Sequence, residues 1–247
     1  MPQKDPKKSS AKNVIWNIFI NFFMKCIILT WASSGLGASL AQVFHDNGYE
    51  VVGLCRTQPA EFVRWIPSDM LDDQKMDEVV AKIRDEYSEF DVLIQCAGDG
   101  DGEEIDKLEW NKTHDVFTLN AIAPIVLTSK LLPLVKKNQA DIINIGATIA
   151  LKPYQYFSVY WASKWAFKLW TENLQLELKG TPSRVIGVYP GGMNTKWNEK
   201  RTHQIETISW RNLGSSFMNT DDIAQFILQI VRLPKNMEIS EVIINRK

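Results

Sequence analysis

The stretch Cys26-Ile-Ile-Leu-Thr30-Trp31-Ala32-Ser33-Ser34-Gly35-Leu36-Gly37 decides the fold of this chain. Its apolar opening predicts a buried strand, and the amphipathic pattern that follows, Gly37–Asn47, predicts a helix closed by Gly48. A glycine-containing turn between a strand and a helix can hold phosphate groups, because the backbone can come close and the helix N-terminus supplies N–H groups. Taken alone, the fragment also fits an ordinary strand-to-helix turn.

Along the rest of the chain, short β-branched runs alternate with amphipathic stretches, as in a parallel sheet with helices on both faces. We therefore expect an α/β fold of one domain, a Rossmann-type doubly wound parallel sheet of about seven strands. The predicted strands are Cys26–Thr30, Glu50–Cys55, Phe62–Ile66, Asp91–Cys96, Asp141–Ile145, Arg184–Tyr189 and Glu241–Asn245. The predicted helices are Gly37–Asn47, Gln74–Tyr87, Lys112–Lys137, Phe157–Leu178 and Asp221–Val231.

Length and composition fit one domain that binds a small molecule. The chain has 247 residues, of which 45% are hydrophobic and 23% charged, and its formal net charge is -1. A chain of this length can bury one large core, and the balanced charge does not favour nucleic acid as a partner. The three cysteines lack the spacing of a disulfide framework or a zinc site. The sequence thus predicts no metal centre and a reducing, cytoplasmic location.

Residues 1–24 are expected to form an extension in front of a domain that spans residues 25–247. Four lysines precede the apolar run Val14–Met24, as in a signal peptide. The run is only about half of the roughly 20 residues that a spanning helix needs, and no small-x-small cleavage site follows it. The pattern favours neither export nor a membrane span, and it leaves a peripheral helix or a dispensable extension as alternatives.

The least regular stretch of the expected domain is Lys196–Asn219. It is long for a connection, and it follows the sixth predicted strand at the carboxyl edge of the sheet, where open α/β sheets bind their ligands. We expect a lid over the substrate at about residues 196–219.

Further motifs stand in the order and spacing of one enzyme family. The segment Tyr160-Trp161-Ala162-Ser163-Lys164 lies in a predicted helix and matches the Tyr-x-x-x-Lys signature of the short-chain dehydrogenase/reductase family. Asn120, the Gln95–Gly98 turn and the Pro190–Thr195 segment stand where that family has its helix asparagine, its Asn-Asn-Ala-Gly turn and its Pro-Gly-x-x-x-Thr segment. The glycine-containing turn resembles the family's Thr-Gly-x-x-x-Gly-x-Gly. The resemblance runs from about Lys25 to the C-terminus.

The resemblance implies a proton-transfer site on the predicted helix Phe157–Leu178. A spacing of four places Tyr160 and Lys164 on one helix face, and an ammonium near a phenol favours the phenolate, so the tyrosine can exchange a proton with a substrate oxygen. Taken alone, such a pair is more often an ordinary surface pair. By resemblance, Lys164 also holds the nicotinamide ribose and Asn120 steers a water. The expected catalytic residues are Tyr160, Lys164, Asn120 and Thr148.

One departure from the family pattern bears on the chemical step. The family's serine lies thirteen residues before the tyrosine, and here this position is Ala147. Alanine cannot polarise a carbonyl, and losing one such donor usually costs about two to three orders of magnitude in rate. Thr148 carries a hydroxyl, but neighbouring strand residues point to opposite faces. It can therefore replace the serine only if the backbone is irregular after Gly146.

A second departure is Trp31, which stands in place of the first glycine of the turn. A bulky residue forced into a glycine-only conformation costs about 1–2 kcal/mol. The indole could occupy the space of the adenosine, or it could stack on the adenine, and the sequence leaves both open.

The residue after the second predicted strand bears on the choice of cofactor. An acid there binds the ribose 2′-hydroxyl of NAD, whereas a base favours the 2′-phosphate of NADP. The chain has Arg56 and no acid at this place, so NADP is favoured, with NAD as the alternative. By resemblance, Asp69 binds the adenine ring. The expected cofactor-binding residues are Thr30, Ser33, Ser34, Gly35, Leu36, Gly37, Arg56, Asp69, Ala97, Gly98, Lys164, Pro190, Gly191, Met193 and Thr195.

Two functions follow from these observations. The favoured one is an NADP(H)-dependent oxidoreductase that transfers a hydride between nicotinamide and a small carbonyl or alcohol compound. The alternative is a protein of the same fold that binds nucleotide or a protein partner without turnover, which Trp31 and Ala147 favour. Retention of Tyr160, Lys164 and Asn120 favours the enzyme, because an inactive chain has no physical need for a proton-transfer pair.

Trp161, Trp165 and Leu169 form an apolar stripe at helical spacing beside the expected catalytic face. Such a stripe is more often core or a subunit interface than a ligand site. Because similar proteins pair through this helix, we expect a homodimer or homotetramer.

Overall fold

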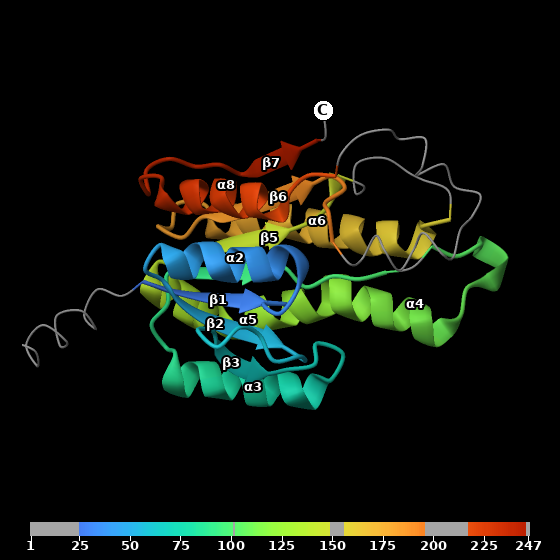
Figure 1. The fold of residues 1–247 in the computed structure, drawn as a ribbon, viewed down its shortest axis with the longest axis horizontal. Coiled ribbons are helices and arrows are strands. Elements are labelled where there is room, and N and C mark those ends of the chain that lie inside the picture. Colours follow the sequence, from blue (N-terminus) through green and yellow to red (C-terminus); the bar gives the residue numbers. More distant parts are fainter. Residues whose placement is uncertain (1–24, 101, 149–155, 196–216, 246–247) are drawn as a thin grey trace, which may run out of the picture.

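The computed structural model describes residues 25–100, 102–148, 156–195 and 217–245. Its seven strands form one sheet in the order β3-β2-β1-β4-β5-β6-β7, and every neighbouring pair is parallel, as expected (Figure 1). The strands are β1 (Cys26–Thr30), β2 (Glu50–Cys55), β3 (Arg64–Pro67), β4 (Val92–Gln95), β5 (Asp141–Ile145), β6 (Val185–Pro190) and β7 (Glu241–Ile244). The expected extension, residues 1–24, and residues 196–216 of the expected lid lie outside the described residues.

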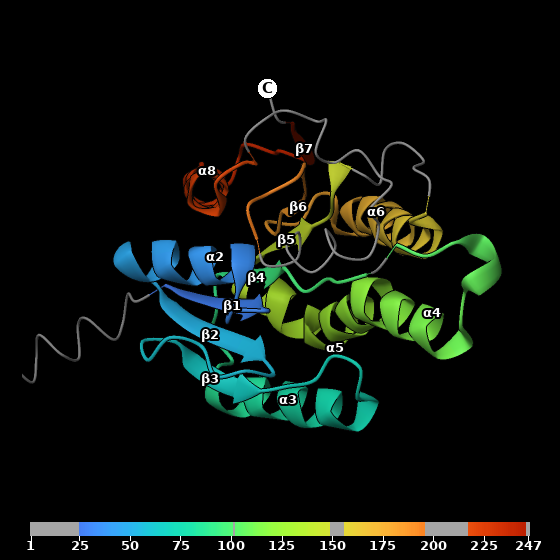
Figure 2. The ribbon, with the colours of Figure 1, turned by 45° about the vertical axis from the view of Figure 1, so that its right-hand side comes forward.

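The helices cover both faces of this sheet. Figure 2 shows α2 and α8 on one side and α3, α5 and α6 on the other, and the two hydrophobic clusters divide in the same way. The helices are α2 (Gly35–Asp46), α3 (Asp73–Glu86), α4 (Trp110–Phe117), α5 (Ala123–Asn138), α6 (Ser158–Leu178) and α8 (Thr220–Arg232), with a short 3-10 turn, η1 (Ile105–Lys107), before α4. The doubly wound fold predicted from the sequence is confirmed.

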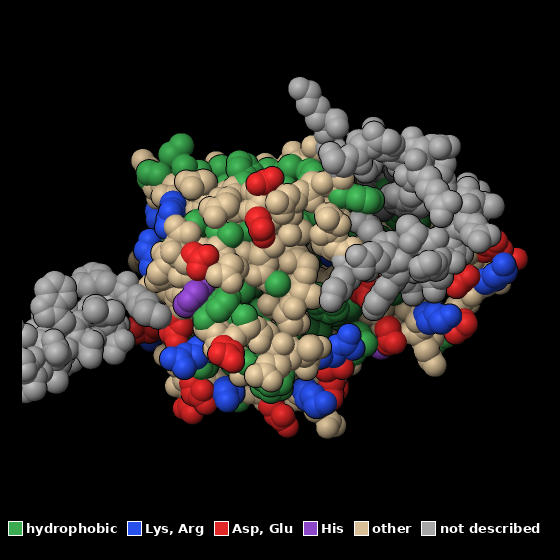
Figure 3. Space-filling view, in the orientation of Figure 1, with side chains coloured by type: hydrophobic (Ala, Val, Ile, Leu, Met, Phe, Trp, Pro, Cys, Tyr) green, Lys and Arg blue, Asp and Glu red, His purple; other side chains and the backbone are tan. Residues whose placement is uncertain are grey.

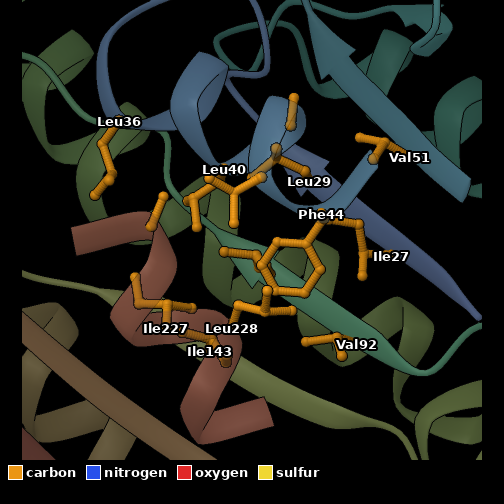
Figure 4. Packing of buried hydrophobic residues seen from close by; sticks show 14 of the residues in the cluster. Ile27, Leu29, Leu36, Leu40, Phe44, Val51, Val92, Ile143, Ile227 and Leu228 are labelled. Carbon is orange, nitrogen blue, oxygen red and sulfur yellow. The ribbon is translucent and has the colours of Figure 1, made fainter. Parts of the chain in front are cut away.

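Alternation along β1 divides the core between the two faces. Ile27 and Leu29 pack in the cluster under α2 and α8, whereas Cys26 and Ile28 belong to the opposite cluster. Figure 4 shows Phe44 of α2 near Ile27 and Leu29, with Leu228 of α8 beside it. Because both faces are covered, the strand reads in the sequence as a continuous apolar run rather than as an alternating one.

Two predicted elements require correction. The third strand was expected at Phe62–Ile66 but runs over Arg64–Pro67, because the N–H of Val63 bonds the carbonyl of Ala60 at 3.0 Å in a turn. The helix expected at Lys112–Lys137 is continuous over Trp110–Asn138 but contains a π-helical segment, η2 (Thr118–Ile122). There the N–H of Ala123 bonds the carbonyl of Thr118, five residues back.

Within the described ranges, one helix is long and apolar enough to cross a membrane by length and composition alone, Trp110–Asn138. In its most apolar window, 44% is buried inside the structure, and Leu127, Leu131 and Val135 are fully buried in the core. A core helix of a soluble protein passes the same test, so this feature is weak evidence for a membrane.

The charged surface shows no region of one sign on the face in Figure 3, as far as the structure describes that face. Acidic and basic side chains are interspersed over its lower part. This distribution agrees with the formal net charge of -1.

A buried ion pair lies at the amino-terminal ends of the strands, opposite to their carboxyl ends. Arg184, just before β6, is paired with Asp141, the first residue of β5, with 2.7 Å between Nη2 and Oδ2. Their side chains are 6% and 1% exposed. The same guanidinium donates to four carbonyl groups that follow or end α8, those of Val231, Leu233, Pro234 and Met237. The chain between α8 and β7 is thereby held against the sheet.

Replacement of Arg184 with methionine is expected to lower the free energy of unfolding by about 3–5 kcal/mol, because Asp141 and the carbonyl groups stay buried and lose the hydrogen bonds of the guanidinium. Urea unfolding followed by circular dichroism measures the change. Lys235→Met is the control: Lys235 also contacts Asp141, at 2.7 Å, but its side chain is 49% exposed. Its loss should cost at most about 1 kcal/mol. Equal losses for both variants would contradict the analysis.

Candidate functional site

The turn between β1 and α2 keeps the backbone of a glycine-containing turn although Trp31 stands in it. Trp31 has φ 67°, in the left-handed region that favours glycine. Its N–H donates to the carbonyl of Leu54 in β2 at 2.8 Å. A Cβ added at Gly37 would lie 2.0 Å from the carbonyl oxygen of Trp31, so only glycine fits in the first turn of α2. The turn therefore tolerates backbone strain at Trp31 and keeps glycine at position 37, where a Cβ would collide with the backbone.

The start of α2 fits a phosphate group. Ser34 is the N-cap residue, and its side chain makes no capping hydrogen bond, so it does not occupy the N–H groups of the first turn. Leu36 is 5% exposed and packs in the core, so it offers only its backbone. Thr195 lies beside the turn: a Cβ added at Gly35 would be 3.3 Å from its Cγ2. These residues fit the pyrophosphate of a dinucleotide.

The segment after β6 is held in place by backbone hydrogen bonds. Gly191 N–H donates to the carbonyl of Ile244 in β7 at 2.8 Å. Asn194 N–H donates to Met218 at 2.9 Å, and Met218 N–H donates to Gly192 at 3.1 Å. These bonds place Thr195 at the turn between β1 and α2. They also show that Pro190, Gly191, Met193 and Thr195 lie at the same sheet edge as that turn.

Thr30, the last residue of β1, connects the turn to the chain that follows β4. Its hydroxyl accepts the N–H groups of Cys96 at 2.8 Å and Ala97 at 3.0 Å. The side chain is fully buried. The predicted cofactor residue Thr30 therefore acts within the protein to position the Ala97–Gly98 turn.

The Ala97–Gly98 turn packs directly on two of the predicted catalytic residues. A Cβ added at Gly98 would lie 2.6 Å from Lys164 Nζ and 3.0 Å from Asn120 Oδ1. Lys164 is 4% exposed, and this burial lowers its pKa to about 8, partly opposed by nearby Asp99. Burial therefore brings the pKa of this lysine closer to neutral pH than the usual value of about 10.4.

Asn120 lies in the π-helical segment and is fully buried. Its Oδ1 accepts the N–H of Asp99 at 3.0 Å, and its Nδ2 donates to the Asp99 carbonyl at 2.6 Å and to Ser163 Oγ at 3.0 Å. Ser163 Oγ in turn donates to the carbonyl of Tyr160 at 2.7 Å. One amide thus connects the chain after β4 with the turn of α6 that carries Tyr160 and Lys164.

The ring of Tyr160 lies against the backbone of Gly100. A Cβ added at Gly100 would lie 2.6 Å from Tyr160 Cδ2, so a larger residue would displace the ring. Tyr160 is 8% exposed and points to the same segment after β4 that Lys164 contacts. The structure therefore brings together Tyr160, Lys164 and Asn120, as the sequence predicted.

Thr148 lies outside the sheet, because β5 ends at Ile145. The alternation argument against it thus does not apply at this position. Its hydroxyl points toward the end of β6, where a Cβ added at Gly191 would lie 3.5 Å from Oγ1. Ala147 is partly exposed and provides no hydrogen-bonding group. Thr148 therefore places a hydroxyl group beside Gly191, next in the chain to the alanine that replaces the family serine.

Arg56 and Asp69 meet beyond the ends of β2 and β3. Arg56 Nη1 lies 3.9 Å from Asp69 Oδ2, with the Arg56 side chain 59% exposed. The Arg56 guanidinium carbon also lies 5.9 Å from the centre of the Trp31 ring. The residues predicted to select the cofactor are therefore in one place.

Sequence reasoning missed Asp99, Ser163 and Gly100, which hold the predicted residues in position. Gly100 has a visible signal, since it belongs to the glycine-containing run Gly98-Asp-Gly100, and Ser163 lies inside the Tyr160–Lys164 motif. The backbone groups of Asp99 carry no such signal. Over the residues that the structure describes, no group of three or more His, Cys, Asp or Glu side chains could hold a metal ion.

Comparisons with known proteins agree with this geometry. The chain is 27% identical over 233 residues to an NADP-dependent 3-hydroxy acid dehydrogenase, YdfG, of Salmonella typhi, a match that covers 87% of this chain and 92% of the relative. It is 26% identical over 231 residues to serine 3-dehydrogenase of Agrobacterium fabrum, covering 87% and 91%. A solved structure of a serine dehydrogenase complexed with NADP+ superimposes with a TM-score of 0.79 at 22% identity, covering 89% of this chain and 94% of the other.

The sequence profile described as short chain dehydrogenase matches residues 25–206, which include the turn after β1, Asn120, the Tyr160–Lys164 motif and the segment after β6. This match spans well over half of the chain and nearly all of the candidate site. The chain belongs to the short-chain dehydrogenase/reductase family of oxidoreductases.

Proposed function

We propose that this chain is an NADP(H)-dependent oxidoreductase that interconverts a small carbonyl compound and the corresponding alcohol. The observation that carries the proposal is the packing of Lys164 and Asn120 against Gly98, with Tyr160 on the same side of α6. A buried lysine one helical turn from a tyrosine, beside a turn that fits a dinucleotide, is an arrangement suited to proton transfer next to a hydride carrier.

In this proposal the residues of the chain bind, orient and move a proton. When bound, the nicotinamide supplies or accepts the hydride. Tyr160 donates a proton to the carbonyl oxygen in the direction of reduction and accepts it in the direction of oxidation. The ammonium form of Lys164 favours the ionised phenol, and burial lowers the pKa of this lysine to about 8. Thr148, beside Gly191, is the candidate donor to the substrate oxygen in place of the family serine.

Arg56 supports NADP as the cofactor. It lies after β2, is 59% exposed at its side chain, and has a guanidinium that can form charge-assisted bonds to a 2′-phosphate. Asp69 is available for the adenine, and the turn residues Ser33, Ser34 and Gly35 for the pyrophosphate. The printed names of a relative and of a similar solved structure both include NADP. NAD remains the alternative cofactor.

The names of the two relatives suggest the first substrates to test. One acts on 3-hydroxy acids and the other on serine, which is itself a 3-hydroxy acid. We propose that a small alcohol bearing a nearby carboxylate belongs at the head of a substrate screen, followed by aldehydes and ketones without one.

A second candidate function is binding without turnover. Two observations favour it: Ala147 has no hydroxyl, and Trp31 brings an indole into the nucleotide-binding turn. The intact network of Asn120, Ser163 and Tyr160 favours the enzyme, because these buried hydrogen bonds hold the proton-transfer residues in position.

We further propose that two copies of the chain associate through α6. Of the apolar stripe on this helix, Trp161 is 5% exposed and belongs to the core, whereas Trp165 and Leu169 are 52% and 60% exposed. Large apolar side chains that face solvent beside each other on a helix mark an interface.

Cys26, Cys55 and Cys96 are all free thiols, which supports the proposed reducing, cytoplasmic location.

NADPH is expected to bind at least about tenfold more tightly than NADH, and Arg56→Ala should remove most of this difference, because charge-assisted bonds to the 2′-phosphate are lost. Titration of NADPH and NADH fluorescence measures both affinities. Arg64→Ala is the matched control, since Arg64 pairs with Glu50 at the opposite end of the strands. Equal affinities in the unmodified chain would refute the proposed preference.

Ala147→Ser is expected to raise the turnover number about tenfold or more without changing the affinity for NADPH, because it restores a hydrogen bond made in the transition state. Steady-state oxidation of 3-hydroxy acids, followed through NADPH absorbance, measures turnover. Tyr160→Phe in either background should abolish activity, since phenylalanine has no proton to give. An Ala147→Ser variant that binds NADPH but turns over no compound of the screen would favour binding without turnover.

Trp165→Glu combined with Leu169→Glu is expected to shift the chain to monomers, because two charges would be buried at the proposed interface. Size-exclusion chromatography with light scattering measures the mass of the assembly. Leu71→Glu is the control: Leu71 is 38% exposed and lies just before α3, outside α6. A monomeric unmodified chain would exclude the interface.

A further inference from the structure

The indole of Trp31 lies beside the guanidinium of Arg56. The guanidinium carbon is 5.9 Å from the ring centre, within the range in which a cation is attracted to the face of an aromatic ring. Tryptophan has the strongest such attraction among the aromatic side chains. The glycine that the family places at position 31 has no side chain and could not make this contact.

Backbone contacts fix the position of Trp31 relative to the end of β2. The Trp31 N–H donates to the carbonyl of Leu54 at 2.8 Å, only two residues before Arg56. The next residue, Ala32, packs on β2, since a Cβ added at Gly53 would lie 2.8 Å from its Cβ. Because the turn and the strand end are tied together in this way, the backbone of Trp31 stays close to the end of β2, and Arg56 lies within reach of its side chain.

The second charged neighbour of Arg56 is Asp69, whose carboxylate oxygen lies 3.9 Å from Nη1. This distance is at the limit of an ion pair, and both side chains are partly exposed, at 59% and 34%. Such a pair contributes little to holding a flexible side chain in one place. The indole is the other neighbour of Arg56, and it can restrict the guanidinium from the ring face while leaving its N–H groups available to an anion.

The left-handed backbone at Trp31 points to the same conclusion. A bulky residue with φ 67° is strained by about 1–2 kcal/mol, and strain of this kind is retained mainly where a site uses it. The contact with Arg56 gives the strained residue a role that glycine could not fulfil.

We propose that Trp31 is a positioning residue for cofactor choice: its ring holds the Arg56 guanidinium where the 2′-phosphate of NADP meets it. This inference rests on the proposed function, and in particular on Arg56 as the group that selects NADP. Trp31 does not itself touch the phosphate. It acts by keeping a long, exposed side chain in the conformation that binds.

The test compares the affinities of NADPH and NADH for the unmodified full-length chain and for Trp31→Gly, Trp31→Leu and Trp31→Phe, by titration of cofactor fluorescence. Trp31→Gly and Trp31→Leu should lower the preference for NADPH about two- to fivefold, the size expected for a partly exposed cation–aromatic contact, with NADH affinity unchanged. Trp31→Phe should keep most of the preference because it keeps a ring. Competition by 2′,5′-ADP and by 5′-AMP, which lack nicotinamide, should show the same pattern.

A double variant separates positioning from a general structural effect. In the Arg56→Ala background, Trp31→Leu should cause no further loss of preference, because there is no guanidinium left to hold. Circular dichroism establishes that each variant is folded. Trp31→Leu keeps an apolar side chain at this position, so it tests the positioning role even if Trp31→Gly loosens the turn.

The outcomes distinguish this inference from the proposed function. Equal weakening of NADPH and NADH by Trp31→Leu, or an effect that adds to that of Arg56→Ala, would overturn the positioning role alone. Tighter NADPH binding by Trp31→Gly would also overturn it, and would show that the indole occupies the space of the adenosine. A chain in which neither dinucleotide binds before any substitution would overturn both the inference and the proposed function.

Discussion

Thr30 Oγ1 accepts the N–H groups of Cys96 and Ala97, and the arrangement of the candidate site depends on this pair of bonds. Thr30 ends β1, directly before the turn that fits the phosphates. The first residues after β4 are bonded to the Thr30 hydroxyl. Farther along this segment, Gly98 contacts Lys164 and Gly100 contacts Tyr160. A single buried hydroxyl thus sets the spacing between the turn and α6, and the rest of the site is built outward from it.

The sequence predicts the central part of the fold closely because pattern and environment agree there. The predicted bounds of Cys26–Thr30, Glu50–Cys55 and Asp141–Ile145 coincide with β1, β2 and β5. These strands are buried on both faces, so their apolar runs stand out. The third strand was displaced because its position depends on a turn at Ala60–Val63, which a short apolar run does not reveal.

The sequence named candidate-site residues whose side chains carry chemistry, and it missed residues that act through their backbone. Tyr160, Lys164 and Asn120 were named from a motif, and the structure brings them together. Asp99 was missed because its N–H and carbonyl, not its carboxylate, bond Asn120. The sequence also did not predict the direction of the Trp31 indole. It left open whether the ring occupies the space of the adenosine or stacks on the adenine. A ring contact with Arg56 depends on the left-handed backbone of the turn and on where β2 ends.

The π-helical segment Thr118–Ile122 has a consequence for how this chain can be aligned and engineered. A π turn holds one residue more than an α turn, and each residue of a helix accounts for about 100° of rotation. The two parts of the long helix therefore present differently phased faces, and they meet different neighbours: α4 contacts α6, whereas α5 contacts α3. An alignment with an uninterrupted helix must place a one-residue gap here. A deletion of one residue within the segment would rotate α4 by about 100° against α5 and turn the side chains that now face α6 away from it, although the sequence on both sides stayed the same.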